Sequence, residues 1–167
     1  DLEAALLSGD QAAAASATPA LGFVTSWWIV GPFDNERGGG FGRVLAEWLV
    51  ECGARHLVLS SRSGASTPEA NDLLERLQDQ GVNATVIKAD IGSPEDVVRL
   101  ISQARALPVP LKGVFHLAMV IDDAPLAALT AERFRTVMAP KALGAWLLHS
   151  HTQDLDLECF VMFSSVS

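Results

Sequence analysis

The sequence predicts an α/β fold, a doubly wound parallel sheet with helices on both faces. Five short apolar runs alternate with four stretches of helical length, and this alternation is typical of βαβ units. Right-handed crossovers between such units make all the strands parallel and place helices on both sides of the sheet. The length of 167 residues suits one α/β domain or part of a larger one.

The first half of the chain contains two strand–helix units. The run "SWWIVG" at 26–31 is apolar throughout and ends in glycine, as expected for a buried parallel strand. A helix is predicted over 40–54, where apolar residues recur at helical spacing until Gly53. The run "RHLVLSS" at 55–61 is the second strand. The following helix, 67–81, has Thr67 as its N-cap and Pro68 at its first position.

The second half repeats the pattern. Strands are predicted at 82–90, 111–118 and 157–165, and the sheet is expected to be truncated after this fifth strand. Ser93 and Pro94 begin the helix at 93–107 in the same cap-then-proline manner. A long helix over 130–152 contains Pro140, which should bend it or split it in two. The alanine-rich residues 1–22 are interpreted as a linker or the tail of a preceding subdomain, and 23–167 as the folded domain.

Composition argues against several classes of partner. The net charge is −8 without any block of basic residues, so we expect no nucleic acid and no membrane as partner. No apolar run approaches the ~20 residues of a membrane span, and the N-terminal residues lack the features of a signal peptide. Cys52 and Cys159 show no metal-ligand spacing, so we expect no metal site. Reduced thiols in the cytoplasm are the favoured interpretation.

Glycines gather between the first strand and the first helix. In a doubly wound sheet this turn holds a cofactor pyrophosphate, because glycines let the backbone approach and the helix N-terminus offers free N–H donors. Gly38, Gly39, Gly40 and Gly42 stand at this place, which favours cofactor binding over a plain flexible turn.

The end of the second strand indicates which cofactor is bound. Folds that accept NAD usually carry an acidic residue about 20 residues after the glycines, on the ribose 2′-hydroxyl. Here that position is Arg62, beside the hydroxyl of Ser61, and an arginine suits a 2′-phosphate. NADPH is therefore the predicted cofactor, the alternative for Arg62 being a solvated surface arginine. Asp90 is placed to reach the adenine edge, or else is a turn residue. The full set of predicted cofactor-binding residues is Gly31, Gly38, Gly39, Gly40, Phe41, Gly42, Ser61, Arg62, Asp90, Ile91 and Ala118.

Several segments together resemble the ketoreductase domain of type I polyketide synthases, a Rossmann-type relative of the short-chain dehydrogenases/reductases. They are "GGGFGRVLAEWLVECGARHLVLSSRSG", "KADIGSPEDV", "GVFHLAMVIDDAPLAALTAERFRTVMAPKALGAWLLH" and "LECFVMFSSVS". The resemblance covers about residues 24–167. It implies reduction, with NADPH, of a β-ketoacyl chain tethered to the phosphopantetheine arm of an acyl carrier protein, beside neighbouring domains of a megasynthase.

The resemblance also implies the catalytic residues. The family lysine falls on Lys141 and the family serine on Ser165. A tyrosine and an asparagine should follow in a Y-x-x-x-N segment, but the sequence contains no tyrosine. We therefore expect a truncation that leaves this stretch alone inactive. A serine hydroxyl would hold the ketone oxygen while tyrosine donates the proton, and a lysine ammonium would favour ionised tyrosine.

Two further positions are compared with the family. "VIDDAP" resembles the L-D-D signature of ketoreductases that set one alcohol configuration, which implies that Asp122 and Asp123 steer the substrate. The alternative is two loop aspartates before a helix. Met119 replaces a common glycine beside the cofactor, and His116 is interpreted as a packed residue at a strand end.

The glycine loop is longer than in relatives, which usually carry something like "VGGxGGxGR". The insert at residues 32–37 either bulges outward and leaves Gly40 and Gly42 in place, or disrupts the turn and weakens binding; we favour an outward bulge with impaired affinity. Loop closure costs little extra for a longer loop, so the fold should survive in both cases.

Two rival functions stay open. The chain could be a non-catalytic, structural reductase-like module of a megasynthase, which the insert favours. Retention of Lys141, Arg62 and the glycines argues against it. A free-standing reductase of small molecules is less consistent with the "PKALGAWLLH" segment.

Overall fold

The computed structural model describes residues 25–33 and 39–164. The strands are β1 (Ser26–Val30), β2 (His56–Ser61), β3 (Asn83–Lys88), β4 (Leu111–His116) and β5 (Cys159–Met162). The α-helices are α3 (Gly39–Glu51), α4 (Pro68–Asp79), α5 (Pro94–Arg105), α6 (Ala131–Met138) and α7 (Gly144–Thr152). A short 3₁₀ turn (Leu126–Ala128) precedes α6, and a π-helical turn (Ala139–Leu143) joins α6 to α7.

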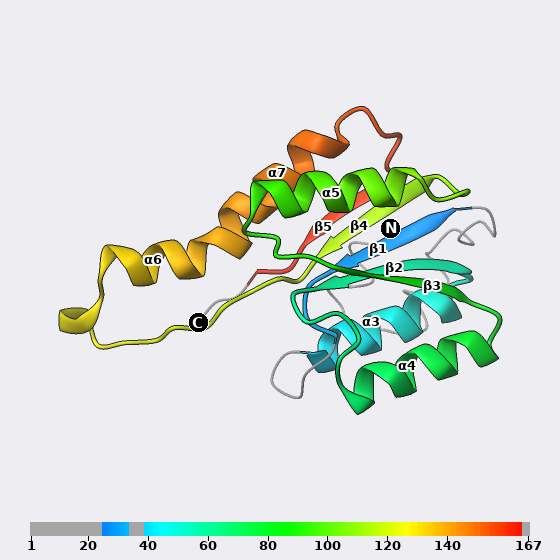
Figure 1. The fold of residues 1–167 in the computed structure, drawn as a ribbon, viewed down its shortest axis with the longest axis horizontal. Helices are drawn as coiled ribbons and strands as arrows, with labels where there is room; N and C mark the ends of the chain where they lie inside the picture. Colours follow the sequence, from blue (N-terminus) through cyan, green and yellow to red (C-terminus); the bar gives the residue numbers. More distant parts are fainter. Residues whose placement is uncertain (1–24, 34–38, 165–167) are drawn as a thin grey trace.

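The strands form one parallel sheet in the order β3-β2-β1-β4-β5, which confirms the predicted fold class (Figure 1). β1 lies at the centre and pairs with β2 on one side and β4 on the other. The chain moves outward from β1 to β3 and then crosses to the far side of β1. The order therefore reverses between β1 and β4, and ligands of such sheets bind at this switch point, outside the carboxyl ends of the strands.

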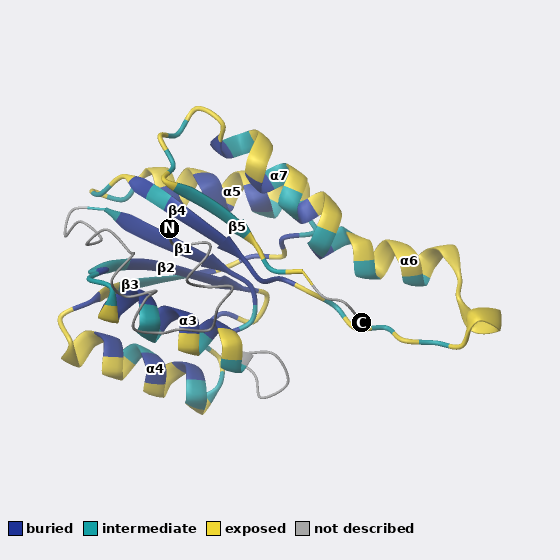
Figure 2. Ribbon diagram, turned by 180° about the vertical axis from the view of Figure 1, so that it is seen from behind, coloured by how far each residue is buried: buried dark blue, intermediate teal, exposed yellow. Residues whose placement is uncertain are grey.

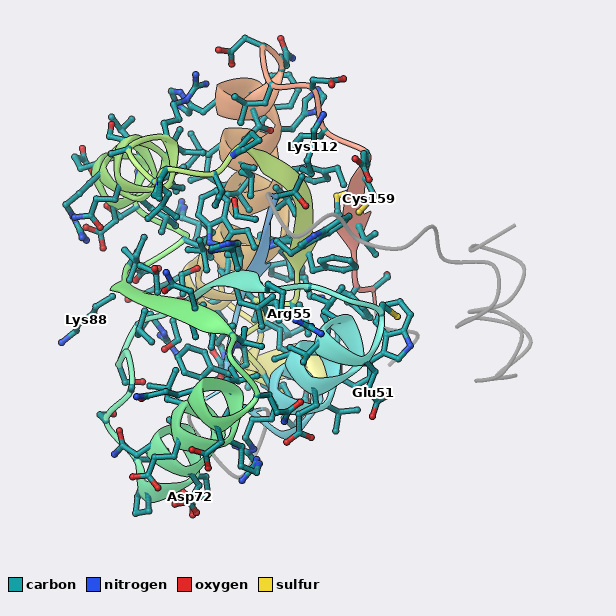
Figure 3. All side chains as sticks on the ribbon, turned by 90° about the vertical axis from the view of Figure 1, so that its right-hand side faces the viewer. Glu51, Arg55, Asp72, Lys88, Lys112 and Cys159 are labelled. Atoms are coloured by element: carbon teal, nitrogen blue, oxygen red, sulfur yellow. The ribbon has the colours of Figure 1, made fainter. Side chains whose placement is uncertain are left out.

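The apolar alternation of the central strand divides the core between the two faces of the sheet. Trp27 and Ile29 pack with α3 and α4 on one face, and Trp28 and Val30 pack with α5 and α7 on the other (Figure 1). Trp28 is fully buried, and its indole N–H donates to Ser60 Oγ at 3.3 Å. Viewed from the side, Lys88 of β3 and Cys159 of β5 mark the two opposite edges of the sheet (Figure 3).

The predicted helix starts are confirmed. Thr67 Oγ1 accepts a hydrogen bond from the Ala70 N–H at the start of α4, and Ser93 Oγ accepts one from the Asp96 N–H at the start of α5. The predicted break at Pro140 is also confirmed. Proline has no N–H to donate to the previous turn, and the helix changes there to the wider π form before α7 continues.

The segment between β4 and α7 extends away from the rest of the molecule as an arm that ends in α6 (Figure 1). We define the arm as residues 119–138. It is largely exposed (Figure 2), including the apolar side chains of Ile121, Leu126 and Phe134. None of the helices within the described residues is long and apolar enough to cross a bilayer.

Candidate functional site

A cavity of about 760 Å³ opens at the carboxyl ends of β1 to β4. The loops that follow these four strands line it, and the last turn of α6 with the π turn closes one side. Of the predicted cofactor-binding residues, this cavity brings together Gly31, Ser61, Arg62, Asp90, Ile91 and Ala118. The cavity therefore coincides with the switch point of the sheet, where a ligand is expected.

Gly31 ends β1 with the backbone in a conformation that disfavours side chains, at φ +146°. A Cβ on this residue would lie 2.8 Å from the backbone N of Ala118 and 2.8 Å from the carbonyl C of Leu117. No residue with a Cβ fits between these strand ends without moving one of them. Glycine therefore keeps the mouth of the cavity open between β1 and β4.

The glycines of the predicted phosphate turn lie just before and within the first turn of α3. Gly38 lies outside the described residues, and Gly39 begins α3. A Cβ on Gly42 would lie 2.5 Å from the carbonyl oxygen of Pro32, so this glycine allows α3 to pack against the loop after β1. Arg43 strengthens the same contact, because its guanidinium donates to the Phe33 carbonyl at 3.1 Å. Most of the insert, residues 34–37, lies outside the described residues, so its predicted bulge stays a prediction.

Phe41, also predicted to bind the cofactor, is instead paired with another ring. Its ring meets the ring of Phe163 edge-on, with the centroids 5.0 Å apart. This contact joins the start of α3 to the segment after β5. Neither Phe41 nor Gly40 is among the residues that line the cavity.

Ser61 is the last residue of β2, and Arg62 follows it at the rim of the cavity. The buried Ser61 hydroxyl accepts from the Gly64 N–H at 3.0 Å, so it shapes the turn that presents Arg62. Arg62 itself is exposed, and no carboxylate in the described part of the chain forms an ion pair with it. Its guanidinium is available to an anionic ligand at this rim.

Asp90 and Ile91 follow β3. One carboxylate oxygen of Asp90 accepts from the Gly92 N–H at 2.9 Å, and the Asp90 N–H donates to Asp96 at 2.7 Å. Asp90 thus acts as the turn residue that the sequence left as an alternative, and it also lines the cavity. Ile91 is buried, and its carbonyl approaches Gly144 so closely that a Cβ there would lie 3.0 Å away. This contact fixes the start of α7 to the cavity wall.

Lys141 lies in the π turn, next to the cavity-lining Pro140. Its ammonium donates to the backbone carbonyl of Phe163 at 2.5 Å. The lysine is therefore held at the point where the chain leaves β5. Ser165, the second predicted catalytic residue, lies two residues further on, outside the described residues, and its role stays a prediction.

The two predicted substrate residues lie on the arm. Asp122 forms an ion pair with Arg133 of α6, and Asp123 is exposed. Neither lines the cavity, although their neighbour Ile121 does, as does Met119, which is 40% exposed. Their predicted part in steering the substrate is not tested by this arrangement.

The sequence did not indicate that Thr136 and Ala139 would line the cavity together with Pro140. Thr136 lies in the last turn of α6 and Ala139 begins the π turn. Helical periodicity does not indicate which loops these residues will face. The proline was the available signal, because a break inside a helix often marks a functional site.

The fold and the cavity together define a doubly wound α/β protein of the Rossmann type. The family model described as "KR domain" matches residues 28–167, and the chain belongs to this family, the ketoreductase domains of polyketide synthases.

Individual relatives agree with this assignment. The "Highly reducing polyketide synthase resH" of Aspergillus sclerotiorum is 43% identical over 134 residues, which cover 77% of this chain and 5% of that protein. Among solved structures, A-type ketoreductases from a modular polyketide synthase share 39% identity with a TM-score of 0.72. An N-terminal ketoreductase from the macrolactin assembly line shares 29% identity with a TM-score of 0.79. Both alignments cover 89% of this chain and 30% of the solved chain, so the chain spans about a third of those chains.

Proposed function

We propose that this chain is part of an NADPH-dependent reductase that converts a β-ketoacyl thioester, carried by an acyl carrier protein, to the β-hydroxyacyl thioester. The cavity at the carboxyl ends of β1 to β4 carries the proposal, since its lining residues come from the strand ends that bind nucleotides in this architecture. The carrier protein, the neighbouring domains of a megasynthase and the cytoplasmic location belong to the same proposal.

The residues present fit the cofactor. Gly31 leaves the mouth free of side-chain atoms where β1 and β4 approach each other. Gly39, Gly40 and Gly42 stand in the first turn of α3, and the first N–H groups of a helix can bind a pyrophosphate, although these glycines do not themselves line the cavity. Arg62 at the rim offers a charge-assisted hydrogen bond to a ribose 2′-phosphate. When bound, reduced nicotinamide supplies the hydride that the ketone carbon accepts.

Two residues of this chain would stabilise the negative charge on the ketone oxygen and assist its protonation. Ser165 would donate a hydrogen bond to it, and this oxygen becomes negatively charged as the hydride arrives. Lys141 would hold its positive charge near the proton donor and so keep the pKa of that donor low. The sequence contains no tyrosine, so the proposed donor is not among these 167 residues, and we expect them to be inactive alone.

The experiment is a fluorescence titration with NADPH and NADH of a complete KR domain that includes these residues. Arg62→Ala should weaken NADPH binding by about 10- to 100-fold, the value of a hydrogen bond to a charged group, and leave NADH binding unchanged. Arg76→Ala is the matched control, since it removes an equal charge from the exposed face of α4. Equal loss of both cofactors, or no loss, would contradict the role of Arg62.

The titration also separates the rival function. A structural module should bind neither cofactor, and in that case a second protein lacking residues 32–36 should be titrated. Binding that returns after this deletion would show that the insert has closed the site. Tight binding to both proteins, followed by turnover of a β-ketoacyl thioester, supports the reductase.

A further inference from the structure

His116 is a buried, titratable side chain to which the proposed chemistry gives no part. It ends β4 at the switch point of the sheet, is 2% exposed, and pairs with Val30 across the strands. Its Nε2 lies 2.9 Å from the carbonyl oxygen of Pro140. A carbonyl can only accept, so Nε2 carries the proton and donates.

The π turn changes which backbone N–H can reach the Pro140 carbonyl. In an α-helix the carbonyl would accept from the N–H of Gly144, four residues later. That N–H donates instead to Ala139, one residue further back. The π turn thus removes the α-helical donor of the Pro140 carbonyl, and the imidazole of His116 donates to this carbonyl.

Besides Pro140, the backbone and the charge of Lys141 also act on the imidazole. Nδ1 is buried and has no hydrogen-bond partner among the described residues. Burial lowers the pKa of His116 below its ordinary value, which agrees with a neutral ring. Burying a polar ring with one unpaired nitrogen costs free energy, and an apolar side chain at this position would avoid that cost. The hydrogen bond to Pro140 is the contact of His116 that an apolar side chain could not make.

Three hydrogen bonds and one peptide bond connect His116, Pro140, Lys141 and Phe163 in a closed ring. The His116 side chain holds Pro140, and Pro140 is bonded to Lys141. Lys141 Nζ donates to the Phe163 carbonyl at 2.5 Å, and the Phe163 N–H donates to the His116 carbonyl at 3.0 Å. Both anchors of Lys141, one through its backbone and one through its ammonium, therefore end on the same residue of β4.

We propose that His116 is a positioning residue, which fixes the π turn through Pro140 and thereby sets the place of the Lys141 ammonium. This rests on the proposed function in so far as Lys141 serves the reduction. The positioning itself is a property of the folded chain and is measured without cofactor or substrate.

The test uses a complete KR domain carrying His116→Phe, which keeps a buried ring but has no donor, and His116→Gln, which keeps an N–H near the position of Nε2. The rate of reductive methylation of Lys141 is measured by mass spectrometry relative to Lys88, which is exposed at the β3 edge (Figure 3). We expect the ratio to rise severalfold in His116→Phe and to return toward the wild-type value in His116→Gln.

Turnover provides the second measurement. Misplacement of a group by about 1 Å can cost about 100-fold, so kcat should fall by about 10- to 100-fold in His116→Phe, with KM nearly unchanged, and recover in His116→Gln. Thr152→Val is the matched control. It removes a buried hydroxyl that donates to the Leu148 carbonyl at 2.8 Å, at the far end of α7, and should lower stability without changing kcat.

The proposal is wrong if folded His116→Phe shows wild-type methylation of Lys141, or if Thr152→Val lowers kcat as much. If His116→Phe does not fold, His116→Asn, whose amide is too short to reach Pro140, is measured in its place against the same limits. If the wild-type protein fails to reduce the thioester, the proposed function fails. The methylation ratio still decides the positioning role.

Discussion

Replacing Gly31 by alanine tests the close approach of β1 to β4 at the mouth of the cavity. The new Cβ would lie 2.8 Å from the Ala118 nitrogen and 2.9 Å from Leu117 Cβ. Two of the three nearest atoms are backbone, so the strand ends themselves must separate. Alanine would also be held at φ +146°, which L side chains rarely adopt.

The two costs can be separated with a second glycine. Gly81 has φ +72°, but a Cβ there would have no neighbour within 4 Å, so Gly81→Ala carries conformational strain alone. A left-handed backbone costs a residue with a Cβ about 1–2 kcal/mol, and overpacking adds about 1–3 kcal/mol. Gly31→Ala should therefore destabilise the protein by about 2–5 kcal/mol, and Gly81→Ala by about 1–2 kcal/mol.

Urea unfolding of both variants, followed by tryptophan fluorescence, measures the difference, because Trp27 and Trp28 lie in the strand that Gly31 ends. At about 2–4 °C per kcal/mol, the melting temperature of Gly31→Ala should fall further than that of Gly81→Ala by several degrees. Equal losses in the two variants would refute the argument, since the crowding between β1 and β4 would then contribute nothing. NADPH affinity should fall only in Gly31→Ala.

Three further predictions concern buried positions. Gly113→Ala should destabilise the protein by about 1–3 kcal/mol in urea unfolding, because its Cβ would collide with the Trp27 ring, and an unchanged midpoint would contradict this. Burial raises the pKa of the Cys159 thiol to about 11, so at pH 8 alkylation should be about 100-fold slower than in the urea-unfolded chain, and equal rates would rule this out. Because burial lowers the pKa of His116, the unfolded chain takes up that proton first as the pH falls, and stability is lost below about pH 6.5. The stability difference between wild type and His116→Gln, from unfolding midpoints at pH 7.5 and 5.5, should therefore shift against the wild type at the lower pH, and a constant difference would exclude the histidine as the cause.

The sheet could be predicted from the sequence because each strand carries a local signal. All five strands were placed, although the structure ends β3 at Lys88, β4 at His116 and β5 at Met162, before the predicted ends. The residues that follow each strand no longer pair with a neighbouring strand and form the loops of the site. Several of them are apolar, so the apolar run in the sequence extends beyond the last paired residue.

The site could be predicted only where strand ends define it. Ser61, Arg62 and Asp90 lie at or just beyond strand ends, and the parallel arrangement brings such residues to one edge. The π turn and the His116–Pro140 hydrogen bond could not be foreseen, since the two residues lie in different elements and meet only when α7 packs on the sheet. Pro140 indicated a break, but not which carbonyl it would leave for a partner.

The strand order also separates the two halves of the core in time as the chain is synthesised. β1 pairs with β2 across a short crossover, in register from Ser26 with His56, whereas its other neighbour begins only at Leu111. Once β3 has been synthesised, the face of the sheet that packs on α3 and α4 has most of its partners. The opposite face, which contains Trp28, is not yet covered, because α5 and α7 have not been synthesised. Because α5 and α7 follow these strands in the sequence, this face is the surface that a nascent chain leaves exposed longest.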